Sequence, residues 1–365
     1  MAGSLVAQPV QKVNVCSSLK DDRWHNRIGP AGFESWHFDA VSDDGREALV
    51  ITFYDNYPMS PRFYEQTNRW AAWTSDPPMS VTRFPAISFV YSVDGITVLS
   101  AVNEMPSGEF ASDTDGLGCK IGDSSFRFKC EDYGKGFFVT VDIGTVRGRR
   151  IHAELEWLFI ESDLAPPETG TSAAVWNMVA PRSDVSGRIS LIGVRGKTRK
   201  LIHFRGSGYH DSISSDNERY RDLSCRTWGR GHFVDSTVVF DHHGVIKNDS
   251  KVGKMFIIRD GEIRDRTAAF EVSLMKRDRW GLAIPRWLSL VTDENVRLNI
   301  RPVSCIRSGF SDVKMLSEFS LDLNDGKVRK TIGITECFDP RRLKNRLFRM
   351  ISDLEIGRDR RSPIF

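Results

Sequence analysis

The segment 206–211 (GSGYHD) groups titratable side chains directly behind two glycines. Glycine in a strand permits a bulge or a close approach of the backbone. On a strand, Tyr209 and Asp211 share one face. An aspartic acid in an apolar pocket has its pKa raised by desolvation, so it can stay protonated, and a neighbouring tyrosine hydroxyl can fix that proton or polarise a carbonyl. The alternative is a turn in which Asp211 caps backbone amides.

A second candidate is the segment 33–40 (FESWHFDA). On a strand, His37 and Asp39 face one way, whereas Trp36 faces the other. The functional interpretation is a set of polar groups in the mouth of a barrel, beside aromatic walls. The alternative is a solvated polar face with Trp36 in the core.

The segment 227–232 (TWGRGH) is the third candidate. Trp228 can form the wall of a pocket, and Arg230 can pair with a carboxylate. Structural burial of the tryptophan is the competing interpretation.

Other common chemistries lack their motifs. The sequence contains no GxxxxGK[ST], no GxGxxG opening a helix, no HExxH and no GxSxG. His242 and His243 are adjacent, so on a strand they point to opposite faces and cannot readily share a metal. The six cysteines form no CxxC pair, which favours buried free thiols over a metal or redox site.

The composition describes an ordinary globular chain. The 51 basic and 48 acidic residues give a net charge of +3, too near neutral to indicate a nucleic-acid binder. The last 25 residues carry +5, which favours a solvated helix face and a frayed end over a phosphate or membrane contact. No apolar run approaches the roughly 20 residues of a membrane helix, and the N-terminus lacks the pattern of a secretory signal, so we expect a cytoplasmic protein.

The elements that must position these residues are mostly strands. Asp-Gly pairs, which suit turns requiring positive φ, occur five times, at 44–45, 94–95, 115–116, 260–261 and 325–326. Several are flanked by β-forming runs, and the stretch 151–159 alternates apolar and polar residues with a period of two. Many short strands at close spacing predict sandwiches or barrels.

Helical periodicity is convincing only near the end of the chain. Residues 341–354 follow Pro340 and place five apolar side chains on one stripe. The Pro- and Gly-rich stretches between 161 and 188 indicate a domain boundary. The prediction is an N-terminal β domain over 1–180 and a C-terminal β domain with the terminal helix over 181–365.

The same motifs carry a resemblance. FESWHFDAVSDDG at 33–45, GSGYHD at 206–211 and TWGR at 227–230 resemble the carotenoid 1,2-hydratase (hydroxyneurosporene synthase) superfamily, whose architecture the fungal lipocalin-like Diels–Alderases share. The resemblance implies two lipocalin-like β domains and a pocket, in or between them, that takes an apolar polyketide or isoprenoid without a cofactor. The hydratase motif resembles GYHDHNWG, in which the aspartic acid is thought to protonate an isolated alkene. This chain matches it from Gly208 to Asp211 and then departs, which puts water delivery to a carbocation in question.

We therefore expect Tyr209, Asp211 and His37 to act in catalysis. We expect the substrate to be contacted by Trp36, Asp39, His210, Trp228 and Arg230. The first hypothesis is a cofactor-independent cyclase or isomerase of the Diels–Alderase type, in which the pocket holds diene and dienophile close together and a hydrogen bond activates a conjugated carbonyl. The alternatives are hydration of an isoprenoid alkene, and a lipocalin-like carrier that retains its ligand unchanged. The sequence leaves the oligomeric state open.

Overall fold

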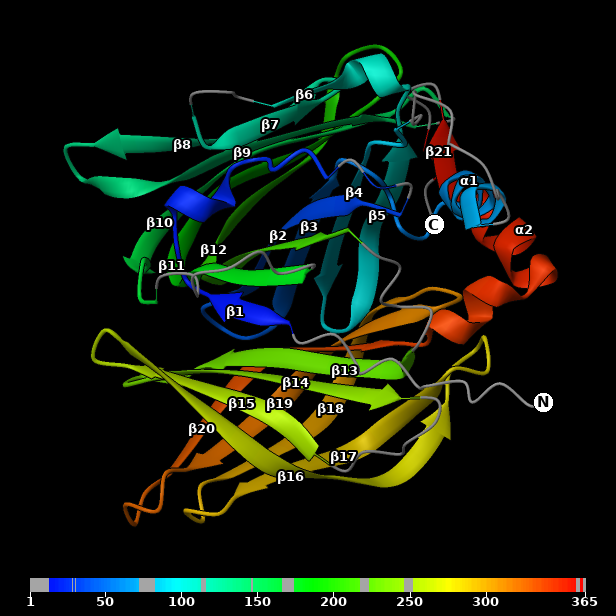
Figure 1. Ribbon diagram of the computed structural model, residues 1–365. Coiled ribbons are helices and arrows are strands. Elements are labelled where there is room, and N and C mark those ends of the chain that lie inside the picture. The colour runs from blue at the N-terminus through cyan, green and yellow to red at the C-terminus, as the bar shows by residue number, and fades with distance from the viewer. Residues whose placement is uncertain are drawn as a thin grey trace, which may run out of the picture.

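The computed structural model describes most of the 365 residues. The described ranges are 13–27, 29, 31–71, 83–112, 116–145, 147–165, 174–216, 223–245, 252–358 and 362–363. They form two β units stacked one above the other, with two helices at one side (Figure 1).

The first unit is a curled sheet of 13 strands. Twelve follow the order β21-β5-β4-β3-β2-β12-β11-β10-β9-β8-β7-β6, and β1 pairs in parallel with β11. Two segments far apart in the sequence, β2 and β12, are therefore neighbours in the middle of the sheet. The bounds are β1 Asn14–Cys16, β2 Phe33–Ser42, β3 Glu47–Tyr54, β4 Ala86–Val93, β5 Ile96–Glu104, β6 Phe110–Ser112, β7 Gly118–Ile121, β8 Ser124–Glu131, β9 Gly134–Gly144, β10 Arg150–Glu161, β11 Ala174–Ile192, β12 Thr198–Ser215 and β21 Ile356–Arg358.

The second unit is a closed barrel of eight strands. Each strand pairs antiparallel with the next, and β13 pairs with β20 to close the ring. This up-and-down connectivity is the lipocalin-like architecture that the sequence resemblance predicted. The bounds are β13 Leu223–His232, β14 Thr237–Val245, β15 Val252–Arg259, β16 Glu262–Arg277, β17 Ala283–Thr292, β18 Arg297–Ser308, β19 Asp312–Asp322 and β20 Val328–Phe338.

The predicted C-terminal helix is present but shorter. A 3-10 turn, η4 (Pro340–Lys344), precedes helix α2 (Arg346–Glu355), because the side chain of Asn345 caps the new helix by accepting a hydrogen bond from the amide of Leu347. Helix α1 (Pro61–Ala71) was not predicted, and the described residues also include two further 3-10 turns, η1 (Lys20–Asp22) and η2 (Ser107–Glu109). Within the described ranges, neither helix has the length and apolar character needed to cross a membrane.

The Asp-Gly turns behave as predicted where they are described. At Asp94-Gly95 and Asp260-Gly261 both residues have positive φ, and each pair joins two antiparallel strands. Gly45 and Gly326 also have positive φ. Asp115 lies outside the described residues.

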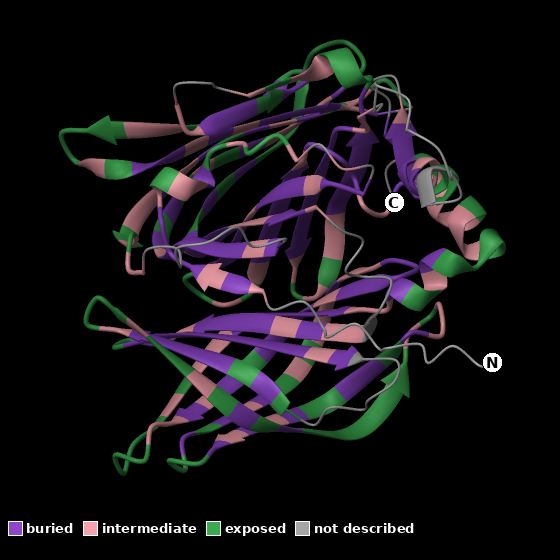
Figure 2. Cartoon of the chain, viewed as in Figure 1, coloured by how far each residue is buried: buried purple, intermediate pink, exposed green. Residues whose placement is uncertain are grey.

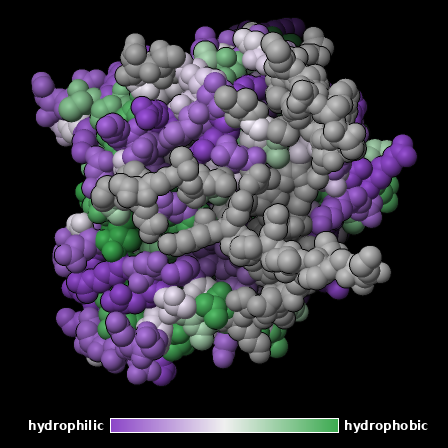
Figure 3. Space-filling model, in the orientation of Figure 1, coloured by the Kyte–Doolittle hydropathy of each residue, from purple (hydrophilic) through white to green (hydrophobic). Residues whose placement is uncertain are grey.

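Both units have filled interiors. Aromatic side chains such as Phe38, Phe126, Phe137 and Trp157 pack inside the curled sheet, and an aliphatic and phenylalanine cluster fills the barrel. Figure 2 shows that the strands facing the other unit are also largely buried, whereas the far side of the barrel around β16 is exposed. The described residues visible in Figure 3 are mostly hydrophilic, with hydrophobic residues in scattered patches. Within the described ranges, packed side chains therefore occupy the middle of both units.

The change from sheet to barrel falls between Ser215 and Leu223. Residue 180, where the sequence places the domain boundary, lies inside β11. Most of the turn-rich stretch at 161–172 lies outside the described residues, and the strands on either side of it, β10 and β11, pair directly. We therefore propose the division after β12, with α2 and β21 returning to the first unit.

Candidate active site

A cavity lies in the seam between the curled sheet and the barrel. Its volume is about 180 Å³, roughly ten times the space that one buried water requires. The sheet contributes β2, β3, β11 and β12, and the barrel contributes the outer faces of β13, β14, β19 and β20. The lining residues are Val13, Phe33, Ser35, His37, Thr52, Tyr54, Pro58, Met59, Trp176, Asp211, Ile213, Ser215, Arg226, Trp228, Asp241, His243, Asp312, Lys314, Glu336 and Phe338.

The character of the wall suits an apolar organic ligand. Five aromatic side chains line it and offer flat apolar surfaces to a ligand. Eight ionisable side chains converge on the same cavity: His37, Asp211, Arg226, Asp241, His243, Asp312, Lys314 and Glu336. Apolar clusters of the seam flank the cavity, one around Val50 and Ile334 and another around Tyr209 and Phe256. These clusters hold the two units together and leave the cavity between them.

The register of β2 and β12 brings two of the predicted segments together. Asp211 pairs with His37 across the two strands, and Tyr209 pairs with Asp39. Because side chains alternate along a strand, all four lie on the face that looks toward the barrel. The prediction that Tyr209 and Asp211 share a face, and that His37 and Asp39 share a face, is confirmed.

Asp211 is the acidic group best placed for chemistry. Its Oδ2 accepts hydrogen bonds from Trp176 Nε1 at 2.7 Å and from the Tyr209 hydroxyl at 2.9 Å. Burial raises the pKa of Asp211 to about 6, although the two hydrogen bonds act in the opposite direction. Among the described residues none bonds Oδ1, and the side chain lines the cavity, so Oδ1 is the oxygen directed at a ligand.

Tyr209 lies behind Asp211 and is 1% exposed, so it is not part of the cavity wall. Burial, followed by the charge of Asp211, raises the pKa of Tyr209. The phenol therefore keeps its proton, and its hydroxyl donates a hydrogen bond to Asp211. The guanidinium carbon of Arg230 lies 5.4 Å from the centre of the Tyr209 ring. Tyr209 therefore positions Asp211.

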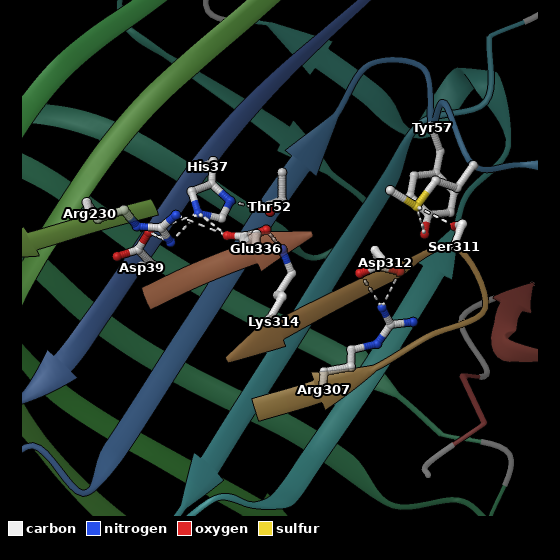
Figure 4. A network of polar contacts seen from close by, with 11 residues as sticks. His37, Asp39, Thr52, Tyr57, Arg230, Arg307, Ser311, Asp312, Lys314 and Glu336 are labelled. Atoms are coloured by element: carbon white, nitrogen blue, oxygen red, sulfur yellow. Dashed lines mark hydrogen bonds and ion pairs between the residues drawn. The ribbon is translucent and has the colours of Figure 1, made fainter. Parts of the chain in front are cut away.

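Arg230 is the centre of a polar network that crosses the seam (Figure 4). It is 2% exposed, contacts the carboxylate of Asp39, and donates to Glu336 Oε1 at 3.0 Å. Its other amino group lies 3.0 Å from His37 Nε2. Lys314 contacts the second oxygen of Glu336. Two carboxylates and two cations from both units thus neutralise one another, as buried charges require.

His37 is neutral in this setting. Burial lowers its pKa well below the usual value, and Arg230 and Lys314 add to that effect. Its Nε2 lies 3.0 Å from an amino group of Arg230 and 2.9 Å from Asp39 Oδ2, and its Nδ1 lies 3.0 Å from Thr52 Oγ1. Glu336 stays ionised, because Lys314 and Arg230 outweigh the effect of burial and hold its pKa below its usual range. His37 is therefore suited to orienting a ligand rather than to carrying a charge.

A second polar group lies on the barrel side of the cavity. Arg226 Nε donates to Asp241 Oδ1 at 2.8 Å, and His243 Nε2 contacts the other oxygen of Asp241. The guanidinium of Arg226 lies over the ring of Trp228 at 4.5 Å and over that of Trp176 at 5.5 Å. Arg226, Trp228 and Arg230 occupy every second position of β13, so their side chains share the strand face that looks toward the sheet.

The sequence-predicted residues thus fall into three places. His37, Asp211 and Trp228 line the cavity, whereas Tyr209, Asp39 and Arg230 form the buried layer behind it. The other two predicted contact residues, Trp36 and His210, lie inside the curled sheet, on the opposite faces of β2 and β12.

The positions of Trp36 and His210 follow from strand alternation. His210 stacks on Phe38 with a centroid distance of 3.9 Å, and its Nε2 lies 2.9 Å from Asp22 Oδ2. Trp36 Nε1 donates to the backbone oxygen of Asp22 at 3.0 Å. Both side chains pack into the core of the curled sheet, so the backbones of β2 and β12 separate them from the cavity on the other face.

Several residues of the site were not predicted from the sequence, among them Arg226, Trp176, Asp241, Lys314 and Glu336. Arg226 could have been predicted from the sequence, because it shares its strand face with Trp228 and Arg230. Trp176 follows the turn-rich stretch that was interpreted as a boundary, and nothing local marked it as a hydrogen-bond donor to Asp211. Asp241 precedes the two histidines that were considered only as metal ligands. As expected from alternation, those histidines diverge: His243 lines the cavity, and His242 stacks on Phe270 of the barrel core.

The described residues contain no group of three or more histidine, cysteine or acidic side chains arranged to hold a metal ion. Cys16, Cys119 and Cys337 are buried free thiols.

Comparisons with known proteins agree with this architecture. No family model matches the chain. A protein of Chlorobaculum tepidum named hydroxyneurosporene dehydrogenase is 20% identical over 357 residues, which cover 95% of this chain and 92% of that protein. The crystal structure of a putative AttH from Nitrosomonas europaea has a TM-score of 0.60 at 14% identity and covers 91% of this chain and 99% of that one.

The crystal structure of CghA is also similar, with a TM-score of 0.56 at 11% identity, covering 91% of this chain and 94% of that one. The structure of CghA with Sch210972 has a TM-score of 0.54 at 12% identity, covering 85% and 89%. Together these comparisons confirm the resemblance stated from the sequence motifs, and the structural likeness establishes the lipocalin-like fold.

Proposed function

We propose that this protein is a cofactor-independent enzyme that folds an apolar polyene and catalyses its intramolecular cyclisation or isomerisation, as a Diels–Alderase of specialised metabolism does. The observation that carries the proposal is the position of Asp211. It is an acid with a pKa of about 6 whose Oδ1 is directed into a cavity walled by aromatic side chains.

The cavity supplies proximity. Diene and dienophile held in one folded conformation react as if at very high effective concentration, which can contribute several kcal/mol to the barrier reduction. The flat faces of Trp176, Trp228 and Phe33 offer surfaces against which an unsaturated chain can pack. A pericyclic step needs no nucleophile, so such walls can be the main catalytic device.

Asp211 supplies a positioned proton. Because Trp176 and Tyr209 both donate to Oδ2, the acidic proton belongs on Oδ1, which is the oxygen at the cavity. From there it can hydrogen-bond to a conjugated carbonyl and draw electron density from the attached alkene, or protonate a double bond directly. The apolar surroundings strengthen that hydrogen bond because water does not compete for it.

Two further observations support a small-molecule function. CghA, which has a similar fold, has been crystallised with Sch210972, and the fungal Diels–Alderases are among the proteins that the sequence motifs resemble. The seam cavity gives this chain a place of its own for such a ligand.

The test is mass spectrometry of organic extracts from cells with and without this protein. Cyclisation or isomerisation leaves the mass of the consumed compound unchanged, so the proposal expects a new peak of equal mass at a different retention time. Asp211→Asn should strongly reduce that peak if Asp211 supplies a proton, and a peak that stays nearly unchanged would mean that the cavity acts by shape alone. Retention of an unaltered compound over many hours, with no product, would instead identify a carrier and refute the enzyme.

The second candidate is hydration of an isoprenoid alkene, and the same acid favours it. Protonation by Asp211 would form a carbocation, to which water adds with loss of a proton. In place of the HNWG that follows GYHD in the hydratase motif, this chain has Ser212-Ile213-Ser214-Ser215, of which Ile213 and Ser215 line the cavity. A product heavier by one water would decide for hydration.

A further inference from the structure

We propose that Arg226 binds the oxygen of a conjugated carbonyl, so that the substrate is an apolar unsaturated chain carrying a ketone, ester or amide. The inference rests on the proposed function of the seam cavity and deepens it by naming the group that the substrate must carry.

The donors of Arg226 are only partly used. Its Nε is bound to Asp241 Oδ1 at 2.8 Å, which anchors the guanidinium by one edge. Among the described residues, none accepts a hydrogen bond from its two terminal amino groups, and the side chain lines the cavity. Since a guanidinium presents its donors in a planar fork, the free edge can hold one oxygen between two N–H groups.

The two indoles fix the plane of that fork. The guanidinium carbon lies 4.5 Å from the centre of the Trp228 ring and 5.5 Å from that of Trp176. Contact with aromatic faces stabilises the cation where water is scarce and restricts its rotation. The donors are thus pre-oriented before a ligand enters, which lowers the entropic cost of binding.

The charge balance favours a neutral oxygen over a carboxylate. Arg226 and His243 outweigh the effect of burial and hold the pKa of Asp241 below its usual range, so Asp241 is ionised and already neutralises Arg226. Lys314 is the only lysine on the described cavity wall, where Arg226 is the arginine, and it forms an ion pair with Glu336. A carbonyl oxygen accepts from the fork without adding a charge to this balanced site.

Trp176 relates this subsite to the acid. Its ring faces Arg226, and its N–H donates to Asp211 Oδ2. A ligand whose carbonyl sits at Arg226 therefore extends its unsaturated chain along the indole toward Asp211. Binding of the oxygen by a cation also withdraws electrons from the conjugated alkene, which is the activation that a cycloaddition requires.

The experiment compares two probes that differ only at the oxygen, β-ionone (a conjugated ketone) and β-ionol (its alcohol). Binding is followed by quenching of tryptophan fluorescence. A charge-assisted hydrogen bond to the ketone should make the wild-type protein bind β-ionone roughly tenfold more tightly than β-ionol. In the double variant Arg226→Met/Asp241→Asn, which leaves no unpaired buried charge, the preference should fall to within about twofold.

Two further variants sharpen the result. Arg226→Lys keeps the ion pair with Asp241 and loses the fork, so it should lower the preference even if the double variant folds poorly. Arg46→Met removes an arginine of an exposed ion pair outside the cavity lining and should retain the preference. Circular dichroism establishes that each variant is folded.

The inference is overturned if the wild-type protein shows no preference for the ketone, including the case in which it binds neither probe. It is equally overturned if folded Arg226 variants keep the full preference. The assay involves no turnover, so its failure is separate from that of the enzyme proposal, which depends on the product formed and on Asp211.

Discussion

At the scale of single residues, the candidate site depends on one carboxylic acid whose two oxygens have different surroundings. Oδ2 of Asp211 is held by Trp176 and Tyr209, and Oδ1 is directed at the cavity. The asymmetry matters because it selects the oxygen that carries the proton. Replacing this acid with an amide therefore removes the acidic proton without disturbing the fold, so that its effect on the reaction can be measured by itself.

Asp211→Asn should lower turnover by roughly 10²–10⁴-fold if a proton is transferred. The amide oxygen can still accept the Trp176 hydrogen bond, so the variant should fold normally. A purely shape-driven cyclisation would hardly respond to this change. Single-turnover kinetics of the purified variant measure the difference. Near-wild-type rates in both Asp211→Asn and Tyr209→Phe would show that neither the acid nor the tyrosine that positions it contributes to the reaction.

The pH dependence follows from the same acid. Since the active form is the protonated one, kcat should be highest below pH 6 and fall about tenfold per pH unit above it. The Tyr209 hydrogen bond lowers the pKa of Asp211, so Tyr209→Phe should raise that pKa and move the falling limb to higher pH. Profiles measured on both proteins test the shift, and a limb that stays in place would show that Tyr209 does not set the acidity of Asp211.

At the scale of elements, the close pairing of β2 and β12 positions the acid. Gly208 faces the interior of the sheet, and a methyl group there would lie 2.6 Å from Trp157 Nε1 and 2.7 Å from the backbone oxygen of Asp39. The glycine therefore allows the two strands and the indole to approach one another.

Gly208→Ala should lower the free energy of unfolding by about 1–3 kcal/mol, because the core must shift to admit the methyl group. It should also reduce turnover, since the strand that moves carries Tyr209 and Asp211. Gly108→Ala is the matched control, because nothing lies within 4 Å of the added carbon there. Urea denaturation of the two variants measures the effect, and equal stabilities would contradict the proposed role of Gly208.

At the scale of the whole molecule, the seam between the two units is held by apolar clusters and by the network around Arg230. Because the cavity lies within this seam, the interactions that stabilise the assembly also shape the site. The network joins β2 of the sheet to β13 and β20 of the barrel.

Arg230→Met should destabilise the protein by about 3–5 kcal/mol, because it leaves Asp39 and Glu336 buried with less compensation. Arg46→Met provides the comparison, since the Arg46–Asp94 pair is exposed and its loss should change stability little. Guanidinium chloride unfolding of both variants tests this contrast. Similar small losses would mean that the seam does not depend on its buried charges.

The sequence by itself determined much about the strands. Asp-Gly turns, period-two alternation and glycine placement depend on local backbone geometry, so the mostly β fold and the shared faces of Tyr209 with Asp211 and His37 with Asp39 could be predicted. The resemblance of three short motifs added the lipocalin-like architecture. The local sequence pattern also singled out Trp228 and Arg230 as candidate substrate-contact residues.

Only the tertiary structure decided where the site is. The pairing of β2 with β12, more than 150 residues apart, and the choice of which strand face meets the barrel depend on long-range packing, which leaves no local signal. For that reason Trp36 and His210 belong to the core of the sheet, Trp176 and Arg226 belong to the cavity, and residue 180 lies within a strand. Along a strand, neighbouring side chains point to opposite faces of the sheet. Which of those faces lines the cavity is decided only by the barrel that packs against it.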